Sequence, residues 1–202
     1  HQAFGVRKLA GEPGLDGAPA PAEPMTEDTI FDLASLTKSL ATTTAFLQLY
    51  EQGRVQIDEP VQSYLPEFNP AADPRRAQVT LRMLLTHTSG IPNYTAQPGF
   101  EATSIVPTTP TTFLRTFAEL PLDFEPGSTF KYSNSGYFLL GAIIEKVNGK
   151  TYTQVLTENV LQSLHMQDTG YDLPETILLK RATDYDKTSM GLYNCRLHTS
   201  DA

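Results

Sequence analysis

The 202-residue sequence predicts a mostly helical chain whose strands are confined to its two ends. Between residues 31 and 165, apolar residues recur at helical spacing, and Gly or Pro residues separate the segments. The opening "HQAFGVRKLAG" is only weakly strand-like. Because one or two strands are not stable alone, an α/β fold would need most of its sheet from outside these residues.

The N-terminal part of the chain predicts a strand remnant, an irregular loop and a long helix. Phe4 and Val6 are apolar members of the strand, and residues 11–24 hold four prolines and three glycines, which excludes regular structure. Residues 31–53 predict the helix, which we expect to end at Gly53 because glycine tolerates the left-handed cap.

The middle of the chain predicts two short helices around a long loop. Thr80 is the expected N-cap of "LRMLLTH", which ends at Ser89 and Gly90. Residues 91–112 hold four prolines and many threonines, so we expect a surface loop that helps to line a cleft. The helix "FLRTFAEL" follows and stops at Pro121.

The segment "TFKYSNSGYFLLGAIIEKVNGK" predicts a buried helix that ends at Gly149. Its apolar residues cover most of the helix circumference: Phe138, Leu139, Leu140, Ile143, Ile144 and Val147. An amphipathic helix follows, with Val155, Leu156, Val160, Leu161 and Leu164 as its apolar face. From Leu173 onward the pattern weakens, and no element is assigned.

Composition excludes several classes of function. The formal net charge is −8, and no Lys/Arg cluster supplies the basic face that a nucleic-acid partner requires. No apolar run approaches the roughly 20 residues of a membrane span. The four histidines show no metal-ligand spacing, and no dinucleotide or phosphate-binding loop is present, so neither a metal nor a cofactor is expected. The single Cys195 cannot form an intrachain disulfide, which leaves the compartment open.

Two Ser-x-x-Lys patterns occur, a number close to the roughly one match expected by chance. Ser128 and Lys131 follow a Pro-Gly turn, where no helix would hold them on one face. Ser35 and Lys38 open the predicted helix, where positions i and i+3 are neighbours. There, a neutral Lys38 would accept the proton of a nucleophilic Ser35. The spacing alone favours the alternative, a first-turn serine and a solvated lysine.

A second motif shifts that balance toward a catalytic site. Tyr132-Ser133-Asn134 follows a Pro-Gly turn and precedes the buried helix, so these residues are expected on a constrained loop. A tyrosine beside a cationic lysine can serve as a general base, and an asparagine can bind a substrate carbonyl. The alternative is a helix N-cap, which does not exclude catalysis. We expect His87 to cap or buttress the end of its own helix rather than to act in catalysis.

Five segments, in family order, resemble the serine β-lactamase and penicillin-binding-protein-like hydrolases, in particular the class C branch with its esterases and D-amino-acid peptidases. They are "TIFDLASLTKSLATTTAFLQLYEQG", "PVQSYLPEF", "VTLRMLLTHTSGIP", "PGSTFKYSNSGYFLLGAIIEKVNGKTY" and "NVLQSLHMQDTGY". The resemblance implies that Ser35 is the acylated nucleophile, Lys38 its proton partner, Tyr132 the general base and Asn134 a substrate-binding residue. It also implies an α/β (α+β) class: the helical lobe of a β-lactamase/transpeptidase-like fold whose antiparallel sheet is largely missing from this chain.

The resemblance divides the chain into three parts: a strand remnant and loop (1–24), a β-lactamase-like helical region (25–172) and a poorly defined C-terminal segment (173–202). The family's third motif, Lys or His, then Thr or Ser, then Gly, is not found, since "LHTSD" at 197–201 lacks the glycine. We therefore expect an incomplete serine hydrolase for an amide, ester or β-lactam carbonyl, with weak turnover.

The alternative is a truncated, non-catalytic binding or structural member of the same family. The expected partner is a small-molecule or peptide-like substrate, without nucleic acid and without a membrane span. A soluble chain, exported after removal of a leader, fits the family, although the sequence fixes neither the compartment nor the oligomeric state.

Overall fold

The structure, a computed structural model, describes the chain except residues 12–16, 99, 101–108, 173–176, 189–190 and 195–202. Cys195, the "LHTSD" segment and part of the predicted 91–112 loop lie outside the described residues. The chain divides into two compact units, each considered by itself below. One unit comprises residues 1–34 and 171–200, and the other centres on residues 35–170.

The first unit contains two small antiparallel sheets. Strand β1 (Val6–Lys8) pairs with β2 (Glu23–Pro24), and β3 (Tyr185–Thr188) pairs with β4 (Gly191–Asn194). The predicted N-terminal strand is therefore confirmed, whereas the prediction that residues 11–24 exclude regular structure is wrong at Glu23–Pro24, which pair with β1. The β3–β4 hairpin lies where the sequence allowed no assignment, because its two four-residue strands, YDKT and GLYN, do not alternate polar with apolar residues.

The second unit begins with a helix that is shorter than predicted. The chain is helical from Leu36, passes through a π-helical turn (η1, Lys38–Thr42) and continues as α1 (Thr43–Glu51). The prediction that residues 31–35 are helical is wrong. Asp32 Oδ1 accepts a hydrogen bond from the Ala34 N–H at 2.7 Å, a local contact that competes with helix formation.

The C-terminal end of α1 confirms the predicted stop at Gly53. Gly53 has a φ of +70°, and its N–H donates to the Tyr50 carbonyl at 2.9 Å. The Arg54 N–H donates to the Leu49 carbonyl, also at 2.9 Å. These two hydrogen bonds form the Schellman cap that a left-handed glycine permits.

Short helices follow in the order α2 (Val61–Tyr64), η2 (Pro66–Phe68), η3 (Arg76–Gln78), α3 (Leu81–Leu85), η4 (Tyr94–Ala96) and α5 (Pro110–Ala118). The prediction that Thr80 caps α3 is confirmed, since its side chain accepts from the Met83 N–H at 3.4 Å. However, α3 ends at Leu85, before the predicted stop. Helix α5 begins at Pro110, earlier than predicted, because Thr109 caps it and proline suits the first helical turn.

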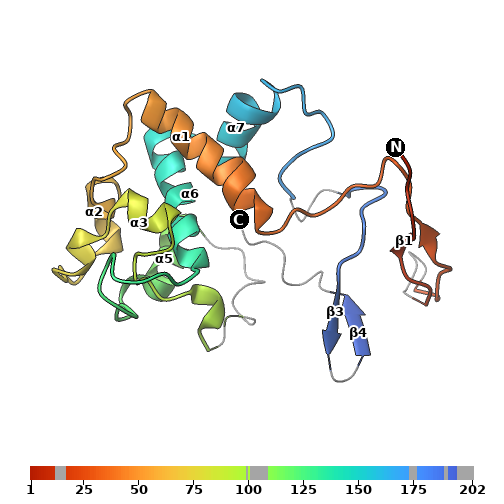
Figure 1. Ribbon diagram of the computed structural model, residues 1–202, viewed down its shortest axis with the longest axis horizontal. Helices are drawn as coiled ribbons and strands as arrows, with labels where there is room; N and C mark the ends of the chain where they lie inside the picture. Colours follow the sequence, from red (N-terminus) through yellow and green to blue (C-terminus); the bar gives the residue numbers. More distant parts are fainter. Residues whose placement is uncertain (12–16, 99, 101–108, 173–176, 189–190, 195–202) are drawn as a thin grey trace. The chain divides into compact units, whose positions relative to one another are not determined.

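Helix α6 (Asn134–Asn148) forms the centre of this unit and contacts α1, α2, α3, α5 and α7 (Tyr152–Leu156). A second π-helical turn, η5 (Thr157–Leu161), continues α7. In Figure 1, α6 runs behind α1 with the shorter helices gathered around it. The core residues with no exposed surface include Phe46, Phe68, Leu81, Leu84, Phe117, Leu139, Leu140, Ile143 and Ile144. Both the buried helix and its stop at Gly149, which has a φ of +67°, are confirmed.

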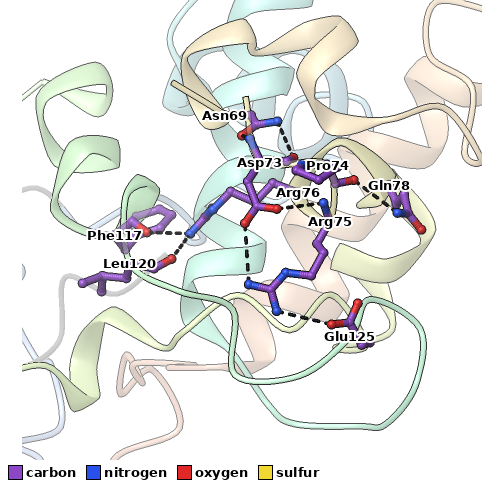
Figure 2. A network of polar contacts seen from close by, with 9 residues as sticks. All are labelled: Asn69, Asp73, Pro74, Arg75, Arg76, Gln78, Phe117, Leu120 and Glu125. Carbon is purple, nitrogen blue, oxygen red and sulfur yellow. Dashed lines mark hydrogen bonds and ion pairs between the residues drawn. The ribbon is translucent and has the colours of Figure 1, made fainter. Parts of the chain in front are cut away.

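A buried arginine closes the end of α5. Arg76 is 3% exposed, and its guanidinium donates to the carbonyls of Phe117, at 3.2 Å, and Leu120 (Figure 2). Neighbouring Arg75 pairs with Glu125 at 3.3 Å. Arg76 thus bonds one carbonyl of the last turn of α5 and one just beyond it, and the two arginines join this helix end and the following segment to η3.

Candidate active site

Ser35 lies in the turn immediately before the helix and is exposed. The preceding Ala34 has a φ of +44°, a conformation that costs an L-amino acid energy and is concentrated at functional sites. The Lys38 N–H donates to the Ser35 carbonyl at 3.2 Å, which closes the first turn. Ser35 therefore sits at the helix start, as the sequence predicts, although one residue outside the helix itself.

Lys38 is the first residue of the π-helical turn, and only 3% of it is exposed. Its Nζ donates to Ser35 Oγ at 3.2 Å. The same Nζ lies 5.3 Å from the ring centroid of Tyr132 and 6.0 Å from that of Tyr137. Among the described residues, none of the ion pairs involves Lys38. The solvated lysine that the alternative interpretation required is absent.

Tyr132 approaches the same serine from a distant part of the chain. It precedes Ser133, the N-cap of α6, whose side chain accepts from the Gly136 N–H at 3.4 Å. Tyr132 Oη donates to Ser35 Oγ at 2.8 Å, and 41% of the tyrosine is exposed. Ser35 Oγ thus accepts hydrogen bonds from both Lys38 and Tyr132.

Asn134 is held by a separate group of polar residues. Its N–H donates to Asn93 Oδ1 at 3.1 Å, and its Nδ2 donates to Thr95 Oγ1 at 3.4 Å. Its Oδ1 is buried and has no hydrogen-bond partner among the described residues. No hydrogen bond joins the Asn134 side chain to Ser35 or Lys38 within the described part of the chain. The structure therefore brings together three of the four predicted site residues and places Asn134 on the adjoining helix start.

His87 contacts the site, whereas the sequence predicted that it would cap or buttress the end of its own helix. It follows α3 with a φ of +57°, and its ring centroid lies 4.6 Å from that of Tyr132. Burial lowers the pKa of His87 below its ordinary value, and the positive charge of Lys38 lowers that pKa further. The only sequence signal was the "HTSG" segment, which contains no hint of which residue the imidazole contacts.

The family model described as Beta-lactamase matches residues 7–199 of this chain. The chain belongs to the beta-lactamase family. The predicted family is therefore confirmed, and so is the fold class, since the helical chain and its small antiparallel sheets align with part of solved structures of this fold.

Individual relatives support the same family and differ in their described activities. The esterase EstB of Burkholderia gladioli is 36% identical over 158 residues, which cover 73% of this chain and 40% of the esterase. A penicillin-binding protein from Bacillus halodurans aligns with a TM-score of 0.73 and 32% identity, covering 89% of this chain and 55% of that protein. A D-amino acid amidase from Ochrobactrum anthropi SV3 aligns at 0.68 and 31%, covering 85% and 49%. The chain thus spans about half, or less, of these relatives.

Two further features of the described residues concern metal binding and membranes. The described residues contain no cluster of three or more His, Cys, Asp or Glu side chains arranged to hold a metal ion. None of their helices is both long enough and apolar enough to cross a membrane.

Proposed function

We propose that this chain carries the nucleophile of a serine hydrolase that acts through an acyl-enzyme on an amide, ester or β-lactam carbonyl, without a cofactor. One observation carries the proposal: Ser35 Oγ lies 3.2 Å from Lys38 Nζ and 2.8 Å from Tyr132 Oη. A nucleophile within hydrogen-bond reach of two groups able to exchange protons is the arrangement that covalent catalysis requires. Lys38 is also buried, which fixes its amine on the serine.

In the proposed first step, Ser35 Oγ bonds to the carbonyl carbon, and the π electron pair of the carbonyl moves to its oxygen. The hydroxyl proton of Ser35 passes to Tyr132 in its unprotonated form, with Lys38 as the second proton partner. The carbonyl then re-forms, the bond to the leaving nitrogen or oxygen breaks, and Tyr132 gives that atom the proton. This leaves an acyl-Ser35 ester.

In the second step, water attacks the acyl carbon and gives one proton to Tyr132. When the ester bond to Ser35 Oγ breaks, Tyr132 returns that proton to the serine, which restores the starting state. The Ser35 N–H is proposed as one donor to the oxyanion formed in both steps. The proton transfers between Ser35 and Tyr132 follow the hydrogen bond that already joins Ser35 Oγ to Tyr132 Oη, and its direction reverses when Tyr132 acts as the base.

Asn134 is proposed to position the substrate. Its buried Oδ1 lacks a partner among the described residues, and a buried acceptor without a donor costs free energy. An N–H of a peptide-like substrate would satisfy that acceptor. Among the relatives, the D-amino acid amidase from Ochrobactrum anthropi was solved with L-phenylalanine amide, and EstB is an esterase, so both amides and esters remain in the proposed substrate class.

A second candidate is a non-catalytic member that binds a substrate-like ligand without turnover. It is favoured by the sequence, which contains no triplet of Lys or His, Thr or Ser, and Gly in that order. In the family this motif supplies part of the oxyanion site, and one lost oxyanion donor typically costs about 3–4 kcal/mol of transition-state stabilisation. A chain that is acylated normally but deacylates slowly or not at all would combine the two candidates: it would form the acyl-enzyme and bind the ligand without turnover.

A fluorescent penicillin and an activated ester test the proposal directly. We expect covalent labelling of the 202-residue chain, and we expect Ser35→Ala to abolish it, because no other residue carries the attacking oxygen. Ser128→Ala is the matched control, since Ser128 belongs to the second Ser-x-x-Lys pattern, and should label normally. Absence of labelling by both probes in the folded wild-type chain would refute the hydrolase and leave the binding candidate.

A further inference from the structure

His87 is bonded to the chain on both sides of Tyr132. Its carbonyl oxygen accepts a hydrogen bond from the Lys131 N–H at 2.9 Å. Its ring Nδ1 accepts a second one from the Ser133 N–H at 3.2 Å. Between these two anchors, its imidazole lies against the Tyr132 ring, with centroids 4.6 Å apart and planes inclined by 36°. A single residue therefore contacts all three residues of the segment 131–133.

The histidine is itself held in a defined position. Its φ of +57° is uncommon for a residue other than glycine, although histidine is among the residue types enriched there. Phe130 meets the imidazole edge-on at 5.9 Å, and Tyr137 lies 5.1 Å from it. Because the ring is packed by three aromatic neighbours, its Nδ1 cannot turn away from Ser133 without loss of these contacts.

We propose that His87 is a positioning residue that keeps the Tyr132 hydroxyl on Ser35 Oγ by holding the Ser133 amide and the tyrosine ring. This inference rests on the catalytic role of Tyr132 given under the proposed function. Tyr132 is 41% exposed and lies in a segment outside any helix, so its own packing does not fix its direction. A misplacement of about 1 Å can reduce a reaction rate by about 100-fold.

The geometry assigns His87 an indirect role. Within the described part of the chain, its imidazole makes a hydrogen bond to the Ser133 N–H and none to Ser35 or Lys38. The accepting Nδ1 must be free of a proton, so this nitrogen is unable to donate to a substrate while the contact exists. His87 thus acts through Tyr132 rather than on the reacting atoms.

Replacements of His87 test the proposal by the rate of covalent labelling with the fluorescent penicillin. We expect His87→Ala to lower the rate about 10- to 100-fold. His165→Ala is the matched control, because His165 is also left-handed, with a φ of +55°, but is exposed and outside the site. His87→Asn should recover the rate to within about fivefold, since its Oδ1 takes the place of Nδ1 on the Ser133 N–H and asparagine tolerates this backbone conformation. The remaining loss would reflect the missing contact with the Tyr132 ring.

Two results would overturn the proposal: a His87→Ala rate within about twofold of the His165→Ala rate, or a His87→Asn variant as slow as His87→Ala. A structural role alone would lower stability without this rescue pattern. Unfolding by urea identifies variants that lose the fold. If His87→Ala unfolds, the labelling rate of His87→Asn still tests the proposal.

Amide exchange of Ser133, followed by NMR, separates this inference from the proposed function. Faster exchange in His87→Ala than in His165→Ala, with a shifted Tyr132 ring signal, supports the positioning role even if the wild-type chain is not labelled. In that case the hydrolase proposal fails and the contact survives. Unchanged Ser133 exchange and an unchanged Tyr132 signal would overturn the positioning role whether or not labelling occurs.

Discussion

The two Ser-x-x-Lys patterns have the same spacing but opposite environments. Lys38 is 3% exposed, and its amine lies on Ser35 Oγ. Lys131 has a half-exposed side chain, and its amine pairs with the Asp123 carboxylate at 2.6 Å. Ser128 lies in a turn, where its N–H donates to the Glu125 carbonyl at 3.0 Å. Lys38 donates a hydrogen bond to the Ser35 hydroxyl, while Lys131 forms an ordinary surface ion pair.

The difference shows what a short motif needs before it can suggest chemistry. Ser128 and Lys131 lie close to Tyr132 in the sequence, and Ser35 and Lys38 lie close to it in space. Of the two serines, Ser35 is the one that accepts a hydrogen bond from the Tyr132 hydroxyl. Burial removes water from Lys38, and the helix start directs its side chain back to the serine. In contrast, Lys131 contributes its backbone N–H to His87, so the second pattern supports the site through the main chain.

The largest expected effect distinguishes the two lysines. Lys38→Ala removes a proton partner of Ser35 and should reduce the labelling rate by about 100- to 10,000-fold. Lys131→Ala removes a surface ion pair and should leave the rate within about twofold, because exposed pairs contribute little. The measurement is the rate of covalent labelling at matched protein concentration. Equal losses in both variants would contradict the assignment of Lys38.

Much of the fold followed from local chemistry in the sequence. The caps at Thr80 and the left-handed stops at Gly53 and Gly149 depend on a few neighbouring residues, and all three occur as predicted. The burial of α6 followed from its composition. The ends of the chain were less predictable, because pairing of short strands depends on partners distant in sequence.

The site was predictable in its members but not in its contacts. Family order identified Ser35, Lys38 and Tyr132, and the structure brings these three together. The left-handed backbone at Ala34 and the contact between His87 and the Tyr132 segment have no local sequence signal. The contact between His87 and Ser133 joins residues 46 positions apart, which a window of adjacent residues does not contain. The roles of all four predicted site residues remain proposals.

Replacing two glycines should have an intermediate effect on stability. The comparison tests the segment that leads to Ser128 and Lys131, the second Ser-x-x-Lys pattern. A Cβ at Gly90 would lie 2.4 Å from the Phe124 carbonyl oxygen, and Gly90 also has a φ of +76°. At Gly53, with a φ of +70°, a Cβ meets nothing within 4 Å. Gly53→Ala should therefore cost only the backbone strain, about 1–2 kcal/mol, whereas Gly90→Ala adds about 1–3 kcal/mol from the clash.

Urea unfolding of both variants measures the difference. Gly90→Ala should also slow labelling, because residues 122–127 lead directly into the Tyr132 segment and pair with residues 88–90. Gly53→Ala lies at the far end of α1 and should label at the wild-type rate. Equal stabilities would show that the Phe124 segment moves freely, and the second pattern would then lose its structural role.

The smallest expected effect is a pH dependence of stability that arises from His87. Its folded pKa is below the ordinary value near 6.5, so below about pH 6.5 the unfolded chain binds a proton that the folded chain does not. The free energy of unfolding should therefore fall as the pH drops through about 6.5 and level off once the folded histidine is also protonated. The charged and titratable groups that face the ring are Lys38, Tyr132 and Tyr137.

His87→Asn should remove this pH dependence of the free energy of unfolding and His165→Asn should keep it, as measured by urea unfolding between about pH 7.5 and pH 5. Identical slopes in the two variants would show that neither burial nor the Lys38 charge lowers the pKa of His87 in the folded chain.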